Sequence, residues 1–225
     1  MSAARAVLWD MDGTLIDSEE FHWISWRDTM ANEGIAITRE QFLSSFGQRN
    51  DSIIPQWLGA ASTSERIEKI ANAKEELYRH LVRNNGISPL PGVANWVDRL
   101  HQQGWLQAIA SAAPRPNIEV VLEALAAAHF FQGIVSAEDV RRGKPDPAVY
   151  LIAASRLGVS PDRCIVVEDA AAGIEGARRA GMRSIGVSQN AKHLDADVEV
   201  PSLDLLDPDA FDTLLENKSC PTQSR

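Results

Sequence analysis

The sequence predicts an α/β protein in which helices cover a parallel sheet and a helical insert interrupts it. Three observations predict it: an apolar run at 6–9 that ends in two acids, an interval of helical patterns at 17–88, and a regular alternation of short apolar runs with helical segments from Trp105 onward. Strands that alternate with helices along a chain are typical of parallel sheets. We therefore expect a core formed by residues 1–16 and 89–225, and a separate helical domain at 17–88.

The first apolar run leads directly into a segment rich in polar groups, Asp10, Met11, Asp12, Gly13 and Thr14. An apolar run of strand length is typical of a buried parallel strand, and ligand sites in such sheets lie at the carboxyl ends of the strands. Side chains two residues apart on an extended chain point to the same side, so Asp10 and Asp12 would face one crevice. The two carboxylates would then form a small anionic pocket suited to a divalent cation. The alternative is that Asp10 and Asp12 are ordinary turn residues that only cap a helix, since Asp and Gly are common in turns.

Composition narrows the class of protein and its partners. The 225 residues are 44% hydrophobic and 24% charged, which is enough for a buried core and a second small domain. The formal net charge of −9, without any basic block, argues against a nucleic-acid or anionic-membrane partner. The chain reaches Asp10 too soon for a signal peptide and has no membrane-length apolar run, so we expect a cytoplasmic protein. We also expect a monomer. Its two cysteines, Cys164 and Cys220, indicate neither a disulfide framework nor a zinc site.

The insert carries three helix-start signatures, in which a capping residue is followed three positions later by Glu or Gln. They are Asp17 with Glu20, Thr38 with Gln41, and Ser62 with Glu65. The last of these predicts a long helix that runs to about Asn84. No convincing strand falls in this interval, so the insert is predicted to be helical throughout.

One cation lies on the apolar stripe of that long helix. The stripe is formed by Ile67, Ile70, Leu77 and Leu81. Lys74 falls between them at helical spacing, so its ammonium either extends past packed side chains to water or reaches an anion in a cleft shared with the core. His22 and Trp26, four apart on the first helix, leave the same two alternatives, and for them we favour packing.

The remaining elements predict where further polar groups lie. After a helix that ends at Gly104, strands are expected at 106–110, 133–136, 164–167 and 184–187, with helices at 117–128, after Pro147 and up to Gly181. Ser111 follows the first of these strands, Glu168 and Asp169 follow the third, and Lys144 lies in a loop between strands. The carboxyl ends of parallel strands share one edge of the sheet, so we expect these side chains to meet Asp10 and Asp12 there.

In order and spacing, these residues resemble the four motifs of the haloacid dehalogenase superfamily. The first motif matches 10–14, the second Ser111, the third Lys144, and the fourth Glu168 with Asp169. The resemblance implies a Rossmann-like core with strand order 5-4-1-2-3, a helical cap inserted after the first motif at 17–88, and Mg²⁺ as the cofactor.

The resemblance also implies roles for the residues. Asp10 would attack phosphorus to form an aspartyl phosphate, and Asp12 would protonate the leaving oxygen and then activate the incoming water or alcohol. Mg²⁺ would be bound by the Asp10 carboxylate, the Asp12 backbone carbonyl and Asp169, with Glu168 either a direct ligand or one step behind. Ser111 and Lys144 would hold the transferring phosphoryl group, with the Thr14 hydroxyl as a further phosphate contact.

An acid at Asp12 separates phosphatase and phosphotransferase members from those that displace halide. Among capped members the chain is similar to the β-phosphoglucomutase group at 17–26, at Lys74 and in the loop 49–52, which implies cap contacts to substrate from Arg49, Lys74 and His22. It departs from that group at Phe46, where the group has a lysine, in a loop one residue shorter, and at Arg115 and Asn117 after Ser111.

These features predict a Mg²⁺-dependent phosphatase that acts on a small phosphorylated metabolite, with a sugar phosphate as one candidate. The alternative is a β-phosphoglucomutase-like mutase, which the departures disfavour. A hypothesis of a different class is a non-catalytic protein that binds a phosphorylated metabolite. The combined presence of Asp10, Asp12, Lys144 and Asp169 speaks against it, because a binding protein needs neither a nucleophile nor an acid.

Overall fold

A six-stranded parallel sheet forms the centre of the molecule. The computed structural model describes residues 4–188 and 193–216, and Cys220 lies outside them. The strands are β1 (Ala6–Trp9), β2 (Leu106–Ala110), β3 (Gly133–Val135), β4 (Cys164–Glu168), β5 (Arg183–Val187) and β6 (Val198–Val200). Their order in space is β3-β2-β1-β4-β5-β6, which confirms the expected 5-4-1-2-3 arrangement and adds β6 beside β5. β6 escaped prediction because it has only three residues and is only partly buried.

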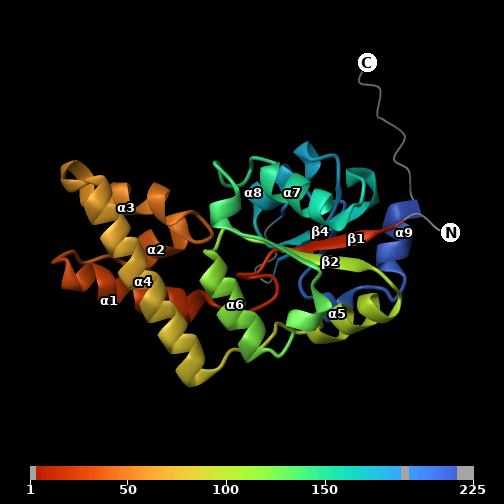
Figure 1. Cartoon of the computed structure of the whole chain (residues 1–225), viewed down its shortest axis with the longest axis horizontal. Helices are drawn as coiled ribbons and strands as arrows, with labels where there is room; N and C mark the ends of the chain where they lie inside the picture. The colour runs from red at the N-terminus through yellow and green to blue at the C-terminus, as the bar shows by residue number, and fades with distance from the viewer. Residues whose placement is uncertain (1–3, 189–192, 217–225) are drawn as a thin grey trace, which may run out of the picture.

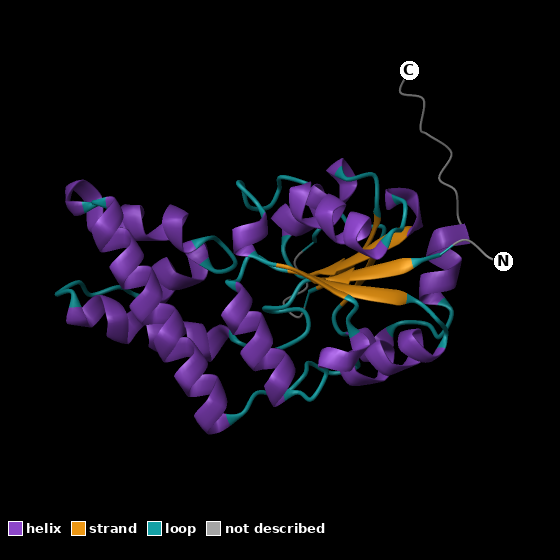
Figure 2. Cartoon of the chain, viewed as in Figure 1, coloured by secondary structure: helices purple, strands orange, loops and turns teal. Residues whose placement is uncertain are grey.

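Helices cover both faces of this sheet (Figure 2). They are α5 (Val93–Gln102), α6 (Arg115–Ala124), α7 (Ala148–Leu157), α8 (Ala171–Arg179) and α9 (Ala210–Glu216). Alternate residues of β1 face opposite sides, as the strand period requires. Val7 and Trp9 pack in the cluster that includes α5, α6 and α9, whereas Ala6 and Leu8 pack in the cluster that includes α7 and α8. The α/β core is thus a three-layer structure.

The interval between β1 and α5 is helical, as expected, and lies to one side of the sheet (Figure 1). It contains α1 (Glu19–Asn32), α2 (Arg39–Ser45), α3 (Asn50–Leu58) and α4 (Ser64–Asn85). A hydrophobic cluster of its own, which includes Trp26, Phe42, Ile54 and Ile70, holds these helices together. The division at residues 17 and 88 stays a prediction, and we refer to these helices as the cap.

Helix α4 belongs to both parts of the molecule. Ile70 packs in the cap cluster, while Tyr78 and Val82, two and three turns further on, pack in the core cluster that includes α6. The residues between these two anchors therefore lie at the boundary between cap and core. Lys74 and Glu75 are among them, and both are buried.

Two of the three predicted helix starts need correction. The capping box at Thr38 is confirmed, because its hydroxyl accepts from the Gln41 N–H at 3.1 Å and Gln41 Oε1 accepts from the Thr38 N–H at 2.8 Å. Helix α4 is capped by Thr63 rather than Ser62. Helix α1 starts after Ser18 rather than Asp17, and no side chain caps it. The Ser18 hydroxyl instead donates to Asp12 at 2.5 Å.

Helix α3 is absent from the predicted elements, since it is short and contains Pro55, a residue that usually ends a helix. Cys164 is a buried free cysteine on β4. Among the described residues, no helix is long and apolar enough to cross a bilayer.

Candidate active site

Three carboxylates meet at the carboxyl edge of the sheet. Asp10 directly follows β1, Glu168 ends the adjacent strand β4, and Asp169 follows it. One carboxylate oxygen from each lies within 4.8 Å of the others. The parallel pairing of β1 with β4, in which Trp9 lies beside Val167, places them at the same level. The structure therefore brings together the acids of the first and fourth motifs.

Two glycines make this crowding possible. Gly13 has a positive φ of 85°, and a Cβ there would stand 2.2 Å from Asp169 Oδ2. Gly173 lies within α8, and there the requirement is one of space alone: a Cβ would stand 2.1 Å from Glu168 Oε2. Any side chain at either position would displace an acid from the cluster.

One cation faces the three acids. The Lys144 ammonium, from the loop before α7, contacts Asp10 Oδ1 and lies 2.7 Å from Glu168 Oε2. The buried Tyr150 hydroxyl donates to the same Glu168 oxygen at 2.8 Å. Glu168 is thereby fixed by two donors, whereas Asp169 receives a bond of 3.1 Å from the Thr14 hydroxyl.

Burial and the crowding of like charges perturb the acids. Burial raises the pKa of Asp10 well above its ordinary value, and Glu168 and Asp169 add to the effect while Lys144 opposes it. Burial and Glu168 likewise raise the pKa of Asp169 to about 7. The pKa of Lys144 is held well above its usual range, because Asp10 and Glu168 outweigh the opposing effect of burial. Within the described part of the chain, these three carboxylates have one ammonium, that of Lys144, in contact with them, so the cluster carries more negative than positive charge.

A divalent cation would supply that charge. Carboxylate oxygens are the hard ligands that Mg²⁺ prefers, and burial together with the neighbouring Glu168 raises the pKa of Asp169, so a cation beside these acids would be favoured. Asp10, Glu168 and Asp169 therefore fit a metal of this kind. The expected contribution of the Asp12 backbone carbonyl stays a prediction.

The predicted phosphate contacts fall in two places. Ser111 is buried and lines a cavity of about 520 Å³, together with Asp10, Asp12, Lys144 and Asp169. Thr14 is fully buried and does not line this cavity; its hydroxyl donates a hydrogen bond to Asp169. In this arrangement Thr14 positions an acid of the cluster, and its contact with phosphate stays a prediction.

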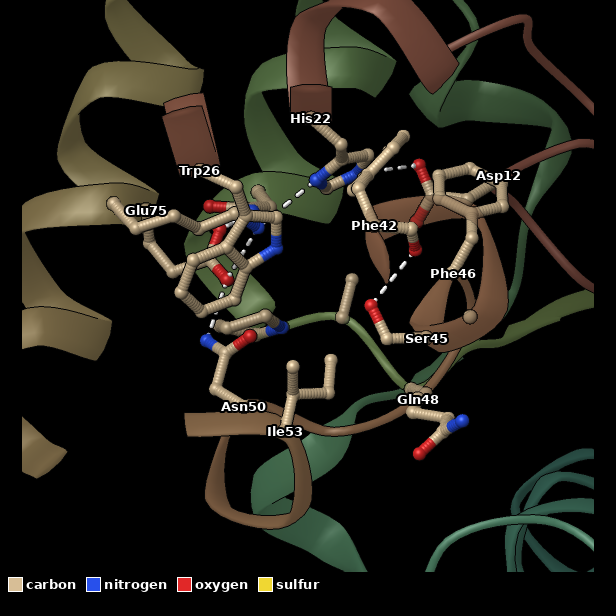
Figure 3. A pocket seen from close by; sticks show the side chains of 16 residues that line it. Asp12, His22, Trp26, Phe42, Ser45, Phe46, Gln48, Asn50, Ile53 and Glu75 are labelled. Atoms are coloured by element: carbon tan, nitrogen blue, oxygen red, sulfur yellow. Dashed lines mark hydrogen bonds and ion pairs between the residues drawn. The ribbon is translucent and has the colours of Figure 1, made fainter. Parts of the chain in front are cut away.

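Asp12 faces the cap rather than the acid cluster. Its Oδ1 accepts from the Ser18 hydroxyl and lies 3.2 Å from His22 Nε2 (Figure 3). The other ring nitrogen of His22 lies 2.9 Å from the Lys74 ammonium. An ammonium can only donate, so Nδ1 accepts and Nε2 carries the proton that is donated to Asp12. Burial raises the pKa of Asp12, but the electrostatic attraction of the His22 ring and the hydrogen bonds that His22 and Ser18 donate outweigh it and hold that pKa below its ordinary value.

The three predicted cap contacts have partners within the protein. Lys74 is almost fully buried, so its ammonium does not extend to water; it lies 2.9 Å from Glu75 Oε1. His22 both packs, stacked on Tyr78 with ring centroids 4.2 Å apart, and reaches Asp12. Arg49 lines the larger cavity, yet its guanidinium binds Asp51 at 2.9 Å and donates to the Ala137 carbonyl at 2.8 Å.

Sequence reasoning missed three groups that complete the site. Ser18 and Tyr150 donate to Asp12 and Glu168, and nothing in their sequence surroundings distinguishes them from packed residues. Glu75 compensates Lys74, and a signal for it was available. An acid directly beside a lysine that points inward on a helix is a candidate partner for that lysine.

The chain resembles known proteins over nearly its whole length. Residues 7–187 match the family model described as haloacid dehalogenase-like hydrolase. Hexitol phosphatase B of Escherichia coli is 35% identical over 218 residues, which cover 90% of this chain and 96% of that protein. Beta-phosphoglucomutase of Bacillus subtilis is 31% identical over 210 residues, covering 87% and 88% of the two chains. The crystal structure of a beta-phosphoglucomutase from Clostridium difficile superposes with a TM-score of 0.85 at 26% identity, covering 95% and 97%.

The acid cluster predicts how stability depends on pH and metal. Without metal, Asp169, with its pKa of about 7, keeps a proton that an unfolded chain loses near pH ~4. The folded state then binds more protons than the unfolded state, so the free energy of unfolding should fall as pH rises toward 7. Mg²⁺ competes with that proton, so in thermal melts it should raise Tm more at about pH 8 than at about pH 5.5.

The variant Asp169→Asn should lose most of this Mg²⁺-dependent rise in Tm. Asp98→Asn, which removes an exposed acid on α5, should retain it. An equal rise in Asp169→Asn and in the unaltered protein would mean that the metal binds elsewhere.

Proposed function

This chain belongs to the haloacid dehalogenase-like hydrolases, and from that premise we propose that it is a Mg²⁺-dependent phosphatase of small phosphorylated metabolites, with sugar and hexitol phosphates as candidates. One observation supports the proposal above the others: Asp10 and Asp12, two residues apart, both line the larger cavity, Asp10 beside Lys144 and the acids that fit a metal, and Asp12 beside donors toward the cap. A nucleophile needs groups that hold the phosphoryl oxygens beside it, whereas a proton donor has to lie toward the leaving group. The two positions therefore suit different catalytic roles.

Asp10 has the position of a nucleophile. It lines the larger cavity beside Ser111 and Lys144, whose hydroxyl and ammonium can hold the oxygens of a phosphoryl group. In the proposed first step the Asp10 carboxylate attacks phosphorus, an aspartyl phosphate forms, and the bond to the leaving oxygen breaks. A bound Mg²⁺ would neutralise charge on the carboxylates and on the phosphoryl oxygens. Lys144 is already within reach of Asp10 and lowers the repulsion between Asp10 and phosphate.

Asp12 has the position of the proton donor and acceptor. It lines both the larger cavity and a smaller pocket toward the cap, where a leaving group would extend. Its lowered pKa means that it is ionised before substrate binds. The negative charge of an entering phosphate raises the pKa of a nearby carboxyl. Asp12 can then take up a proton, deliver it to the leaving oxygen, and accept one from the water that attacks the aspartyl phosphate.

The cap supports a hydrolase over the mutase alternative. A mutase has to grip a second phosphate while its phosphoenzyme is protected from water, which calls for free cations in the cap. Phe46, which lines both cavities, is neutral. Arg49 and Lys74 are each bound to an acid of this chain. The resemblance to hexitol phosphatase B is consistent with this choice.

The nucleophile can be tested by Asp10→Asn, which nearly preserves the shape of the side chain. We expect release of phosphate from a panel of sugar and hexitol phosphates to require Mg²⁺, and to fall at least about a hundredfold in the variant, equivalent to ~2.7 kcal/mol in the barrier. Thermal melts should show that the variant is folded, and Asp98→Asn should keep full activity. A variant that retains more than a hundredth of the rate would rule out Asp10 as the nucleophile.

A separate time course distinguishes hydrolase from mutase. β-Glucose 1-phosphate is supplied with a catalytic amount of glucose 1,6-bisphosphate, and glucose 6-phosphate and inorganic phosphate are followed together. We expect free phosphate as the main product. Phe46 has no charge, and Arg49 and Lys74 are each paired with an acid of this chain, so none of the three is available to hold a second phosphate. If glucose 6-phosphate forms much faster than phosphate, the chain is a mutase.

A further inference from the structure

A small pocket beside Asp12 lies where the leaving group of a substrate would extend. Its volume is about 50 Å³, and it shares Asp12, Phe46 and Gln48 with the larger cavity that holds Asp10. Toward the cap it is closed by apolar and neutral polar side chains, including Trp26, Ser45 and Asn50 (Figure 3). Since the two cavities meet at Asp12, a phosphate ester bound at Asp10 would place its alcohol portion here.

Among the described residues that line this pocket, Lys74 is the one Lys or Arg. Its ammonium is 2.9 Å from Glu75 Oε1, 2.9 Å from His22 Nδ1, and 5.1 Å from the centre of the Trp26 ring. The ammonium is thus occupied by partners within the cap. Its charge is compensated by Glu75 before any ligand arrives.

Glu75 is itself held rigidly in place as an anion. Asn50 Nδ2 donates to Oε1 at 2.6 Å, and Asn117 Nδ2 donates to Oε2 from the core helix α6. Asn117 in turn accepts from Arg79 at 2.9 Å. Burial raises the pKa of Glu75, but Lys74, His22 and Asn50 outweigh it and hold that pKa below its ordinary value. The carboxylate therefore stays charged, and with Asp12 it makes the pocket negative overall.

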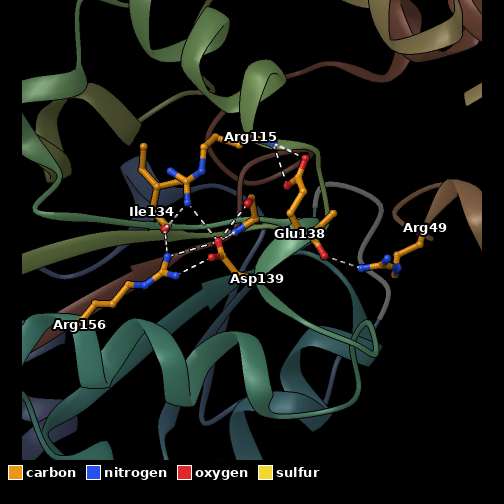
Figure 4. A network of polar contacts seen from close by, with 8 residues as sticks. Arg49, Arg115, Ile134, Glu138, Asp139 and Arg156 are labelled. Carbon is orange, nitrogen blue, oxygen red and sulfur yellow. Dashed lines mark hydrogen bonds and ion pairs between the residues drawn. The ribbon is translucent and has the colours of Figure 1, made fainter. Parts of the chain in front are cut away.

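Two arginines near the cleft do not reverse this charge. Arg49 is bound to Asp51 and to the Ala137 carbonyl, and Arg115 is bound to Asp139 at 3.1 Å (Figure 4). Among the described residues that line the two cavities, Lys74, Arg49 and Lys144 are each paired with an acid of this chain, so a leaving group that carries a second phosphate or a carboxylate would meet Glu75 and Asp12 without a free cation from this lining. A neutral alcohol would meet the amide and hydroxyl groups of Gln48, Asn50 and Ser45.

We propose that Glu75 determines substrate class: by occupying Lys74 and lending its own charge to the pocket, it selects phosphate monoesters of uncharged polyhydroxy alcohols and rejects esters whose leaving group is an anion. This inference rests on the proposed phosphatase activity. It assigns Glu75 the role of a specificity-determining residue that acts through Lys74 and takes no part in the transfer of the phosphoryl group.

A matched pair of substrates tests the proposal. Sorbitol 6-phosphate and 6-phosphogluconate have the same carbon chain and differ chiefly at the far end, where the second carries a carboxylate. With Mg²⁺ and the full chain, we expect kcat/KM to favour sorbitol 6-phosphate by about tenfold or more. In Glu75→Gln, which keeps the shape of the side chain and frees the Lys74 ammonium, that preference should fall at least about fivefold, mainly through a lower KM for 6-phosphogluconate.

Glu76→Gln is the control, because Glu76 is the next residue on α4 and is exposed. It removes the same charge from the same helix and should leave the preference unchanged. Equal preference in Glu75→Gln and the unaltered protein would overturn the role of Glu75. If Glu75→Gln does not fold, the unaltered protein decides, since equal kcat/KM for the two esters would also overturn it. Release of phosphate from neither ester, nor from any ester of the wider panel, would instead contradict the proposed function.

Discussion

The site depends on the enforced proximity of three carboxylates around one ammonium. Asp10, Glu168 and Asp169 are held together by the pairing of β1 with β4 and by the space that Gly13 and Gly173 leave open. Buried like charges repel strongly, and removing one partner of a buried ion pair is typically destabilising by about 3–5 kcal/mol. The fold tolerates the cluster because Lys144 and Tyr150 bind Glu168, and because Asp169 is partly exposed. The remaining lack of positive charge is what makes this edge of the sheet suited to a metal cation.

The second constraint is the way α4 joins the cap to the core. Because this helix is anchored in both hydrophobic clusters, the polar residues that face the boundary between the anchors, Lys74 and Glu75, are buried and must be paired. Lys74 and Glu75 pair with each other, and Asn117 extends the pair to the core. His22 connects the same group to Asp12. The hydrogen bonds of Asp12, the proposed acid, are therefore tied to the position of the cap.

The strands of the sheet and the polar residues at its edge could be predicted because they follow from short local patterns, in which apolar runs end in acids or serine, whereas the strand order was available only from the family resemblance. Helix starts at 17 and 62 were wrong by one residue, since neighbouring Asp, Ser and Thr all make acceptable caps, and Ser18 is used by Asp12 instead. The partners of Lys74, Arg49 and Thr14 could not be predicted. Each of these partners is one of several nearby acceptors, and only the tertiary structure determines which of them is in reach. The sequence pattern indicates only that Lys74 points inward and that Thr14 lies beside Asp10 and Asp12.

The most direct test of the division of labour between Asp10 and Asp12 is a rapid-quench experiment on Asp12→Ala with p-nitrophenyl phosphate. Nitrophenolate leaves without an acid, whereas hydrolysis of an aspartyl phosphate needs the base that this variant lacks. We predict a burst of about one nitrophenolate per chain followed by slow turnover, as expected for a covalent intermediate. Mass spectrometry of the quenched protein should find the phosphoryl group on the peptide that contains Asp10. Steady release without a burst, with no phosphorylated peptide, would contradict the account.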